Sequence, residues 1–245
     1  MLVDAHIHLG MFDDIPNVIK KSSQSNIQLC QVGINLEESS SLLKLIENKH
    51  HKVGTVPVFV GIHPWYGQNH NFDEILFLEL LKSPYVVGIG ECGLDSKIEY
   101  PLNQQIKLLE KHLDLASKFK LPVNLHIRGC HGDLIRTLKK YQGKVTGIIH
   151  NFTFSYEIAK SYLDLGYVLS IGHHILMGQD KHNEVIKKVG LDKILLETDL
   201  DYEHTGPYDP SLLKNEYDYL SRLLNLKIED IENTLQTTFE KVIRK

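Results

Sequence analysis

The chain has 245 residues, of which 42% are hydrophobic and 24% are charged, as is ordinary for a globular protein with a sizeable core. Its formal net charge of -4 excludes an overall basic field that attracts nucleic acid, so phosphate binding would need local Arg, Lys, His or metal. Three widely spaced cysteines, no apolar run of the roughly 18 residues that a membrane helix needs and no leader pattern together predict a cytoplasmic protein with reduced thiols.

Eight apolar, β-branched runs are predicted to be strands, and near-continuous runs of this kind are typical of parallel strands covered on both faces. They are Leu2–His8, Ile27–Ile34, Val56–Ile62, Tyr85–Glu91, Val123–Ile127, Val145–Asn151, Tyr167–Ile171 and Ile194–Asp199. Helical periodicity fills the intervals, at Ile15–Ser23, Ser39–Asn48, Phe72–Leu81, Leu102–Ala116 behind Pro101, Asp133–Tyr141, Ser155–Leu165, Lys181–Val189 and Leu212–Leu224. Eight βα units in series predict an α/β fold, a (β/α)8 TIM barrel. The tail Ile228–Ile243 adds extra C-terminal helices that we expect on the outside, and residues 1–245 are predicted to be a single domain because no linker or repeat is visible.

The first run carries the motif Asp4-Ala5-His6-Ile7-His8. Residues two apart in a strand face the same side, so His6 and His8 are predicted to point together, with Val3, Ala5 and Ile7 on the other face. Two imidazoles on one side of a strand make half of a metal site. The chain has 14 His, so this pair alone could be chance, and its weight depends on the later strand ends.

In a TIM barrel the chemistry lies at the C-terminal ends of the strands. Residues with metal-ligand chemistry end four of the later runs, namely Glu91, His126, His150 and Asp199. Together with the first pair they supply four imidazoles and two carboxylates. That set suits two cations about 3.5–4 Å apart with a carboxylate bridging them.

The ordered set of motifs resembles the TatD-like family of metal-dependent hydrolases, a branch of the amidohydrolase-like barrels. The motifs are His-x-His, Gly-x-His-Pro, Gly-Glu-x-Gly-Leu-Asp, Leu-Pro-Val-x-Leu-His-x-Arg, the sixth-strand His and Glu-Thr-Asp, and they cover about the first 200 residues. The resemblance implies that one metal is held by His6, His8 and Asp199, that the other is held by His126 and His150, and that Glu91 bridges both. It also implies a deoxyribonuclease, often a 3′ exonuclease, that uses two divalent metal ions (Mg, Mn or Zn).

The chemistry of phosphodiester hydrolysis agrees with those roles. It requires an activated water and relief of charge on the leaving oxygen, and two cations supply both. We therefore predict catalytic roles for Glu91, as the bridge, and for Asp199, as a ligand that also accepts a proton from the attacking water. The alternative for Asp199 is a helix N-cap after the eighth strand.

Three further residues are candidates for substrate binding. Arg128 lies two residues after the fifth-strand histidine and could bind a phosphate through both arms of its guanidinium, although an exposed salt bridge is the alternative. His63 could contact substrate or leaving group, or could make a structural hydrogen bond. Trp65 could stack on a base or cap the apolar layer of the barrel. Asp95 could orient a histidine ligand, but we favour a role in pinning a turn at Gly93.

The segment after the eighth strand departs from the family. Asp201 stands where most members have Pro. Elsewhere in the chain, Asn151, directly after His150, stands where Cys is common. Asp201, Glu203 and Asp209 make the segment acidic, with no Lys or Arg between Lys193 and Lys214. Carboxylates at this side of a cleft would repel a polyanion, so short or frayed single-stranded ends should be preferred over internal duplex sites.

The sequence therefore predicts a divalent-metal-dependent deoxyribonuclease or phosphodiesterase that acts on single-stranded or frayed DNA ends or on a small phosphodiester. It predicts no membrane partner and favours a monomer. Three alternatives stay open: an amidase, lactonase or other ester hydrolase on the same barrel, a phosphatase of another His-rich barrel class, and an inactive, metal-free binding protein. The first alternative is less favoured because its two-metal members commonly bridge with a carboxylated Lys, where this chain has Glu91.

Overall fold

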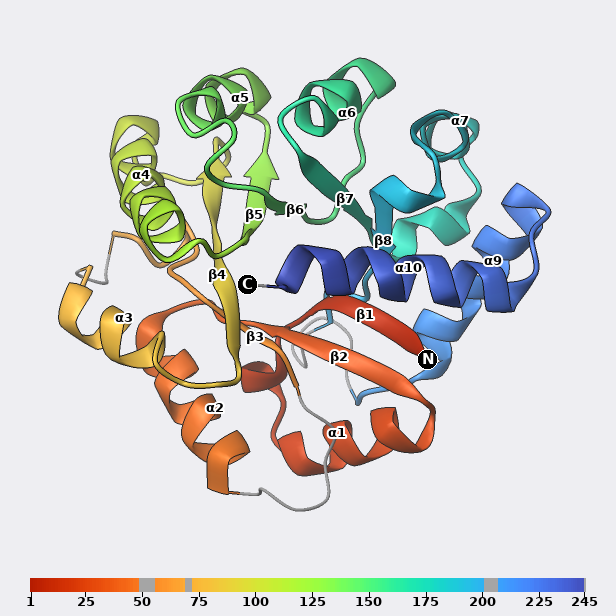
Figure 1. The fold of residues 1–245 in the computed structure, drawn as a ribbon, viewed down its shortest axis with the longest axis horizontal. Helices are drawn as coiled ribbons and strands as arrows, with labels where there is room; N and C mark the ends of the chain where they lie inside the picture. The colour runs from red at the N-terminus through yellow and green to blue at the C-terminus, as the bar shows by residue number, and fades with distance from the viewer. Residues whose placement is uncertain (49–55, 69–71, 201–206, 245) are drawn as a thin grey trace.

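The computed structural model describes residues 1–48, 56–68, 72–200 and 207–244. Eight parallel strands pair in chain order to form one sheet that curls into a barrel (Figure 1). The strands are β1 (Leu2–Ile7), β2 (Ile27–Val32), β3 (Val58–Val60), β4 (Val86–Asp95), β5 (Val123–Arg128), β6 (Gly147–Ile149), β7 (Tyr167–Ile171) and β8 (Ile194–Leu196). The predicted TIM barrel is confirmed.

Helices follow the strands and surround the barrel. They are α1 (Ile15–Gln24), α2 (Leu36–Asn48), α3 (Glu74–Leu80), α4 (Leu102–Phe119), α5 (His131–Lys139), α6 (Tyr156–Leu163), α7 (Asp180–Val189), α9 (Ser211–Leu224) and α10 (Ile228–Ile243), with short 3-10 helices η1 (Leu9–Met11), η2 (His173–Met177) and η3 (Leu191–Lys193). No helix in the described part of the chain is long and apolar enough to cross a membrane.

Local signals explain where several helices begin. Asp14 accepts a hydrogen bond from the backbone N–H of Asn17 at 3.1 Å, and Asp73 accepts one from Leu76 at 3.0 Å. Each carboxylate thereby satisfies an N–H that has no partner inside the first turn of its helix. Pro101 directly precedes α4, where its fixed φ suits helix entry and its missing N–H costs nothing.

The C-terminal helix differs from the prediction. Instead of packing on the outer wall, α10 lies across the N-terminal end of the barrel and contacts β1 and β8 (Figure 1). Its Phe239 is fully buried in an apolar cluster that draws residues from five strands: Val3, Ala5, Cys30, Val32, Phe59, Ile148 and Leu195. Side chains from so many strands can meet only inside a barrel, so α10 closes the inner core at the end opposite the strand C-termini.

The prediction that Val3, Ala5 and Ile7 share one face was also wrong, because Val3 and Ala5 lie in the inner cluster and Ile7 does not. The register of β1 against β2 shifts between Asp4 and Ile7, which breaks the simple alternation of faces. Ala5 therefore belongs to the inner cluster, whereas Ile7 packs in the larger cluster between the barrel and its helices.

The barrel closes between β1 and β8 through a set of polar contacts. The backbone N–H of Asp199 donates to the carbonyl of His6 at 2.9 Å, and Thr198 donates to the Asp4 carboxylate from its N–H at 3.0 Å and its hydroxyl at 2.6 Å. Burial is the main reason that the pKa of Asp4 is raised to about 7. This seam brings the functional ends of the two strands side by side.

A buried carboxylate on α9 makes the fold sensitive to pH. Glu216 is fully buried, and neither of its carboxylate oxygens has a hydrogen-bond partner among the described residues. Burial, followed by the charges of Asp4 and Glu197, raises its pKa well above the usual 4.5. The folded state therefore binds more protons than the unfolded state, so this group lowers stability progressively as the pH rises above about 4.5.

We expect Glu216→Gln to raise the free energy of unfolding at pH 8 by about 1–3 kcal/mol, since each unit by which folding raises the pKa of this carboxyl costs about 1.4 kcal/mol once the pH lies well above 4.5, and a Gln side chain does not ionise. The gain should shrink as the pH is lowered toward 5, because the penalty grows only as the pH rises above about 4.5, the usual pKa that this carboxyl has in the unfolded state. Urea unfolding of the wild type and the variant at pH 5 and at pH 8 measures this gain in the free energy of unfolding. An equal gain at pH 5 and pH 8 would mean that packing, and not ionisation, is responsible.

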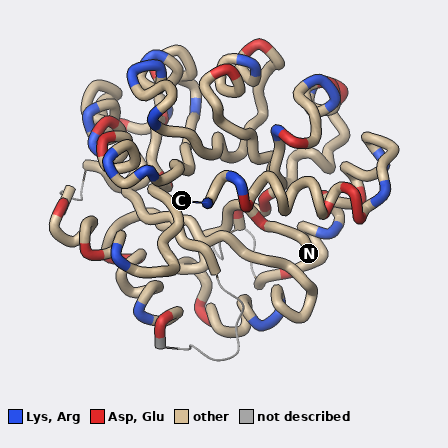
Figure 2. Tube along the Cα trace, in the orientation of Figure 1, with Lys and Arg blue, Asp and Glu red and all other residues tan. Residues whose placement is uncertain are grey.

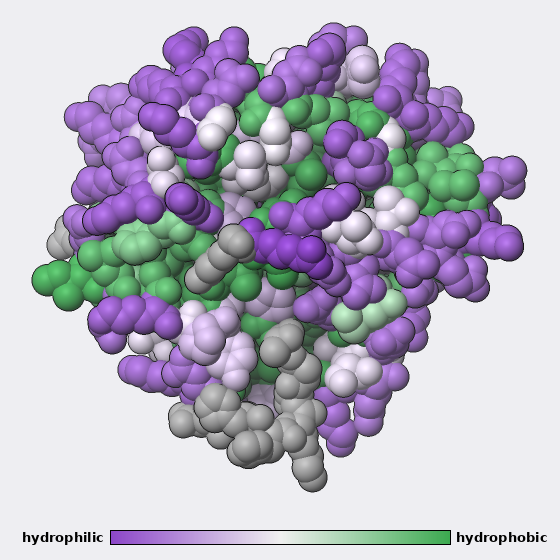
Figure 3. Space-filling view, in the orientation of Figure 1, coloured by the Kyte–Doolittle hydropathy of each residue, from purple (hydrophilic) through white to green (hydrophobic). Residues whose placement is uncertain are grey.

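Charged side chains are unevenly spread over the face seen in Figure 1. Lys and Arg gather along α4 and α5, whereas Asp and Glu are more frequent elsewhere (Figure 2). The space-filling view of the same face is strongly hydrophilic over these two helices (Figure 3).

Candidate metal centre

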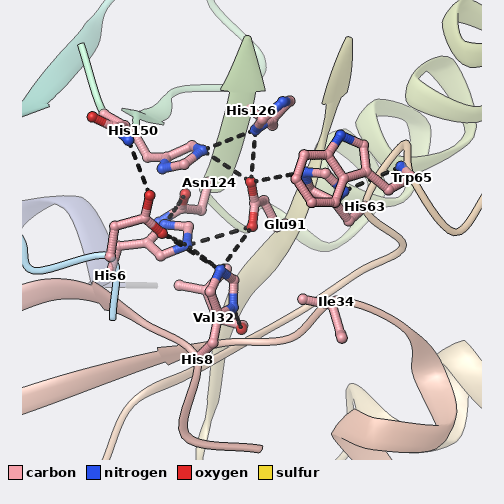
Figure 4. Close-up of polar contacts among 12 residues, drawn as sticks. His6, His8, Val32, Ile34, His63, Trp65, Glu91, Asn124, His126 and His150 are labelled. Atoms are coloured by element: carbon pink, nitrogen blue, oxygen red, sulfur yellow. Dashed lines mark hydrogen bonds and ion pairs between the residues drawn. The ribbon is translucent and has the colours of Figure 1, made fainter. Parts of the chain in front are cut away.

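Six side chains from five strand ends meet at the C-terminal mouth of the barrel, and Figure 4 labels all of them except Asp199. They are His6 and His8 at the end of β1, Glu91 in β4, His126 in β5, His150 after β6 and Asp199 after β8. The sequence-predicted ligand set therefore lies together, because parallel strands end at the same edge.

Glu91 stands at the centre of this cluster and is almost fully buried. Its Oε1 lies 3.0 Å from His126 Nδ1 and 2.9 Å from His150 Nε2. Its Oε2 lies 3.4 Å from the Nε2 atoms of both His6 and His8. One carboxylate oxygen thus faces each histidine pair, which is the division that the family resemblance implies.

Asp199 completes the side of the first histidine pair. Its Oδ1 lies 3.6 Å from His6 Nε2 and 3.5 Å from His8 Nε2. The amide of Asn151 donates to its other oxygen, Oδ2, at 3.0 Å. The next described helix, α9, begins only at Ser211, so Asp199 caps no helix in the described part of the chain.

The remaining ring nitrogens of the first pair fix where the protons lie. His6 Nδ1 is 3.1 Å from the side-chain oxygen of Asn124, and His8 Nδ1 is 3.0 Å from the carbonyl oxygen of Val32. These oxygens can only accept, so both Nδ1 atoms carry the proton in the neutral ring. Both Nε2 atoms are then left with a lone pair that faces Glu91.

In the second pair, His126 and His150, the ring nitrogen turned away from Glu91 also faces an oxygen acceptor, here a carboxylate. His126 Nε2 lies 3.4 Å from Asp95 Oδ2, and His150 Nδ1 lies 3.4 Å from Glu197 Oε1. Carboxylates in this position orient a histidine and raise its basicity toward a metal. The lone pairs of all four imidazoles therefore converge on the oxygens of Glu91, an arrangement that is repulsive unless a proton or a cation lies between them.

The ring of His63 is oriented the other way, because the nitrogen that faces Glu91 carries the proton instead of the lone pair. Its Nδ1 accepts from the backbone N–H of Trp65 at 3.1 Å, so its proton lies on Nε2, which is 3.3 Å from Glu91 Oε1. His63 is close enough to Glu91 and His126 to be grouped with them as a metal-binding set. A neutral ring held this way offers no lone pair to a cation, and we therefore place it outside the ligand set.

The charges of the cluster agree with a site built for cations. Burial tends to raise the pKa of Glu91, but His63, His150 and His126 together hold it well below its usual range. Burial likewise tends to lower the pKa of His8, yet the carboxylates of Asp199 and Glu91 raise it to about 9. The carboxylates remain ionised and the site attracts positive charge.

A cavity of about 330 Å³ opens beside the cluster. It is lined by Trp65, His126, Ile127, Arg128, His150, Asn151, Thr153, Phe154 and Asp199. The guanidinium of Arg128 is exposed and has no hydrogen bond or ion pair with another described residue, so it is available to a ligand. Trp65 is 50% exposed at the rim.

The prediction that Asp95 pins a turn at Gly93 is wrong, because β4 continues through Gly93 and ends at Asp95. Asp95 Oδ2 accepts from the indole N–H of Trp65 at 2.7 Å and faces His126, while Oδ1 accepts from the N–H of Lys97 at 2.7 Å. These bonds hold the pKa of Asp95 well below its usual value despite burial, which tends to raise it.

Sequence reasoning assigned no role to Asn124, Glu197 or Asn151. Asn124 lies two residues before His126, and that spacing placed it on the same strand face. Glu197 belongs to the Glu-Thr-Asp motif, and its Oε1 also accepts from the N–H of Asn151 at 2.6 Å. No local pattern indicated the contact between Asn151 and Glu197, which are 46 residues apart.

Most of the predicted acidic segment, including Asp201 and Glu203, lies outside the described residues. Asp209 is described and exposed, and its Oδ1 accepts from the N–H of Ser211 at 2.8 Å at the start of α9.

Comparison with known proteins gives consistent matches along the chain. The profile of the family described as TatD related DNase matches residues 3–244. The chain is 31% identical over 212 residues to an uncharacterized metal-dependent hydrolase, YjjV, of Escherichia coli, covering 80% of this chain and 78% of the relative. It is 30% identical over 217 residues to the 3′-5′ ssDNA/RNA exonuclease TatD of Edwardsiella piscicida, covering 82% and 80%. The crystal structure of the Escherichia coli TatD homologue YjjV superposes with a TM-score of 0.84 at 26% identity, covering 99% of this chain and 97% of that one.

Proposed function

The chain belongs to the TatD related DNase family of metal-dependent hydrolases, and we propose that it hydrolyses phosphodiester bonds at single-stranded or frayed nucleic-acid ends with two divalent metal ions. The observation that carries the proposal is the convergence of four imidazole lone pairs on the two oxygens of Glu91. In this proposal residues 1–245 act as one domain.

The donor set fits two divalent cations. His6, His8 and Asp199 would hold one and His126 and His150 the other, with one oxygen of Glu91 on each side. Bound there, the cations would activate water and neutralise charge on the scissile phosphate. Imidazole and carboxylate donors suit Zn²⁺ or Mn²⁺ and also admit Mg²⁺.

The remaining side chains have distinct roles in the proposal. Asp199 accepts a proton from the attacking water, and the amide of Asn151 keeps its Oδ1 turned toward the cluster. Of the two roles left open for His63, the structural hydrogen bond is favoured over a substrate contact, because its N–H faces Glu91 Oε1 at 3.3 Å. Burial lowers its pKa to about 4, so it acts near neutral pH as an uncharged hydrogen-bond donor. Trp65 offers an exposed ring at the cavity rim on which a base can stack.

We expect Arg128→Ala to raise KM for an oligonucleotide by about tenfold, since a charge-assisted bond to phosphate contributes about 1.5–3 kcal/mol. Arg128→Lys should recover part of that loss, because it restores the charge but not the fork-shaped pair of donors. Metal content, measured by atomic absorption, should stay unchanged in both variants. Equal kinetics in all three proteins would assign Arg128 to the solvated surface.

End-labelled oligonucleotides test the proposed function directly. The apo protein, supplied separately with Mg²⁺, Mn²⁺ and Zn²⁺, is offered matched single-stranded, blunt duplex and closed circular DNA. Shortening of the single strand from one end is the expected result. Efficient nicking of the circle would overturn the preference for ends, and failure to cleave any of the three with any metal would overturn the nuclease function.

A further inference from the structure

One fifth of the chain has a charge opposite to that of the rest. Residues 97–144 contain ten Lys and Arg but only four Asp and Glu, a net charge of +6 within a chain of net charge -4. This segment builds α4, β5, α5 and the turns around them. The positive charge is therefore concentrated on one sector of the barrel (Figure 2).

Most of this positive charge forms no ion pair with a described residue, although Lys111 lies over the ring of Phe72 and Lys118 over that of Phe119. Arg136 pairs with Asp133 at 2.9 Å and Lys140 pairs with Glu110 at 2.6 Å. The other exposed lysines form no ion pair with a described residue, and we call them the α4–α5 basic face: Lys97, Lys107, Lys111, Lys118, Lys120, Lys139 and Lys144. Unpaired like charges on neighbouring helices repel one another, and a bound polyanion relieves that repulsion.

Two contacts link α4 to the end of α5. Lys140, directly after α5, reaches Glu110 of α4 at 2.6 Å, and the hydroxyl of Tyr141 donates to Asp114 at 2.8 Å. These contacts hold α4 and α5 side by side, so the lysines of the two helices belong to neighbouring elements.

The end of the α4–α5 basic face that contains Lys97 lies next to the cavity, at the C-terminal ends of β4 and β5. The backbone N–H of Ser96 donates to the carbonyl of Arg128 at 2.9 Å, which joins the ends of β4 and β5. The side chain of Lys97 lies beside Gly129, directly after the cavity residue Arg128. From there α5 descends nine residues, about 13.5 Å at 1.5 Å per residue, to Lys139.

We propose that the α4–α5 basic face binds the phosphate backbone of a single-stranded nucleic acid and leads its end into the cavity. A cavity of about 330 Å³ is at the lower limit for a small ligand, so most of a longer strand must lie outside it. Grooves that bind single strands without sequence preference use rows of cations along the backbone. The inference rests on the proposed function for its substrate class, but binding and cleavage can be measured separately.

The test compares two triple variants that remove the same charge. Lys118→Gln, Lys139→Gln and Lys144→Gln neutralise the face. Lys181→Gln, Lys187→Gln and Lys214→Gln neutralise exposed lysines on α7 and α9 that also form no ion pair with a described residue. Binding of fluorescent 20-residue oligo(dT) and oligo(U) is measured by anisotropy with metal chelated, and both variants are checked by circular dichroism.

We expect the face variant to bind both oligonucleotides about tenfold or more weakly at low salt, with the log–log salt slope reduced by about 2 for three lost contacts at ~0.7 each. The control variant should bind as the wild type does. With metal restored, hydrolysis of bis(4-nitrophenyl) phosphate should be equal in all three proteins, because that small diester needs no backbone track.

An equal loss of oligonucleotide binding in the two triple variants, or no loss in either, would overturn the proposed role of the α4–α5 basic face. The proposed function would still stand. Normal strand binding without cleavage by any metal would overturn the nuclease function and keep the face. Face-dependent binding of phosphatidylserine vesicles without strand binding would assign the face to a membrane and overturn the proposal.

Discussion

Glu91→Ala is expected to abolish turnover and to release bound divalent metal together. Glu91 is the only residue of the described site with an oxygen facing each histidine pair, at 2.9–3.0 Å on one side and 3.4 Å on the other. Its loss leaves four lone pairs without the charge that holds cations among them. A loss of several kcal/mol of transition-state stabilisation corresponds to a rate fall of several powers of ten, at about 1.4 kcal/mol for each.

Metal content and kcat measured on the same preparation check this expectation. Glu216→Gln is a control, because it also removes a fully buried carboxyl but lies on α9 outside the cluster. Chelation of the wild type should reproduce the loss of activity, and added divalent ion should restore it. Undiminished hydrolysis by thoroughly depleted wild-type protein would rule out the two-metal proposal.

Asp199→Asn is expected to lower the rate by a hundredfold or more while metal content falls much less, as is typical when a general base is removed. Asparagine has the same shape and tolerates the left-handed backbone at this position, where φ is +51°. Its amide oxygen can still face the cations but is a far weaker proton acceptor than a carboxylate. Burial tends to raise the pKa of the partly buried Asp199 carboxyl, but the imidazoles of His8, His150 and His6 lower it further than burial raises it, so the carboxyl is ionised near neutral pH.

Single-turnover rates at saturating metal separate the two roles of Asp199. Asn151→Gly is an informative companion, because glycine accepts the φ of +46° and only the amide that holds Oδ2 is removed. That variant should fall between the wild type and Asp199→Asn. A rate for Asp199→Asn within about threefold of the wild type, well under 1 kcal/mol, would show that Asp199 is not the proton acceptor.

The sequence by itself determined that the chain forms a barrel and which side chains meet at its C-terminal mouth. Apolar runs such as Tyr167–Ile171 predicted strands, and the alternating helical periods required them to be parallel. Parallel strands in one barrel end at one mouth, so Glu91, His126 and His150 had to lie near one another wherever the intervening chain ran. The TatD resemblance, carried by short motifs at those strand ends, is confirmed by the family match over residues 3–244.

The tertiary structure alone decided which nitrogen of each histidine faces Glu91. That choice depends on acceptors such as Asn124 for His6, 118 residues away, and Val32 for His8, 24 residues away. It also set His63 apart, since a single backbone N–H from Trp65 reverses the polarity of its ring. Neither periodicity nor motif spacing encodes such contacts, because they depend on where side chains meet in space after the barrel has closed. For the same reason only the packed structure showed that α10 seals the inner core with Phe239 and that the basic residues of α4 and α5 gather in one sector of the barrel.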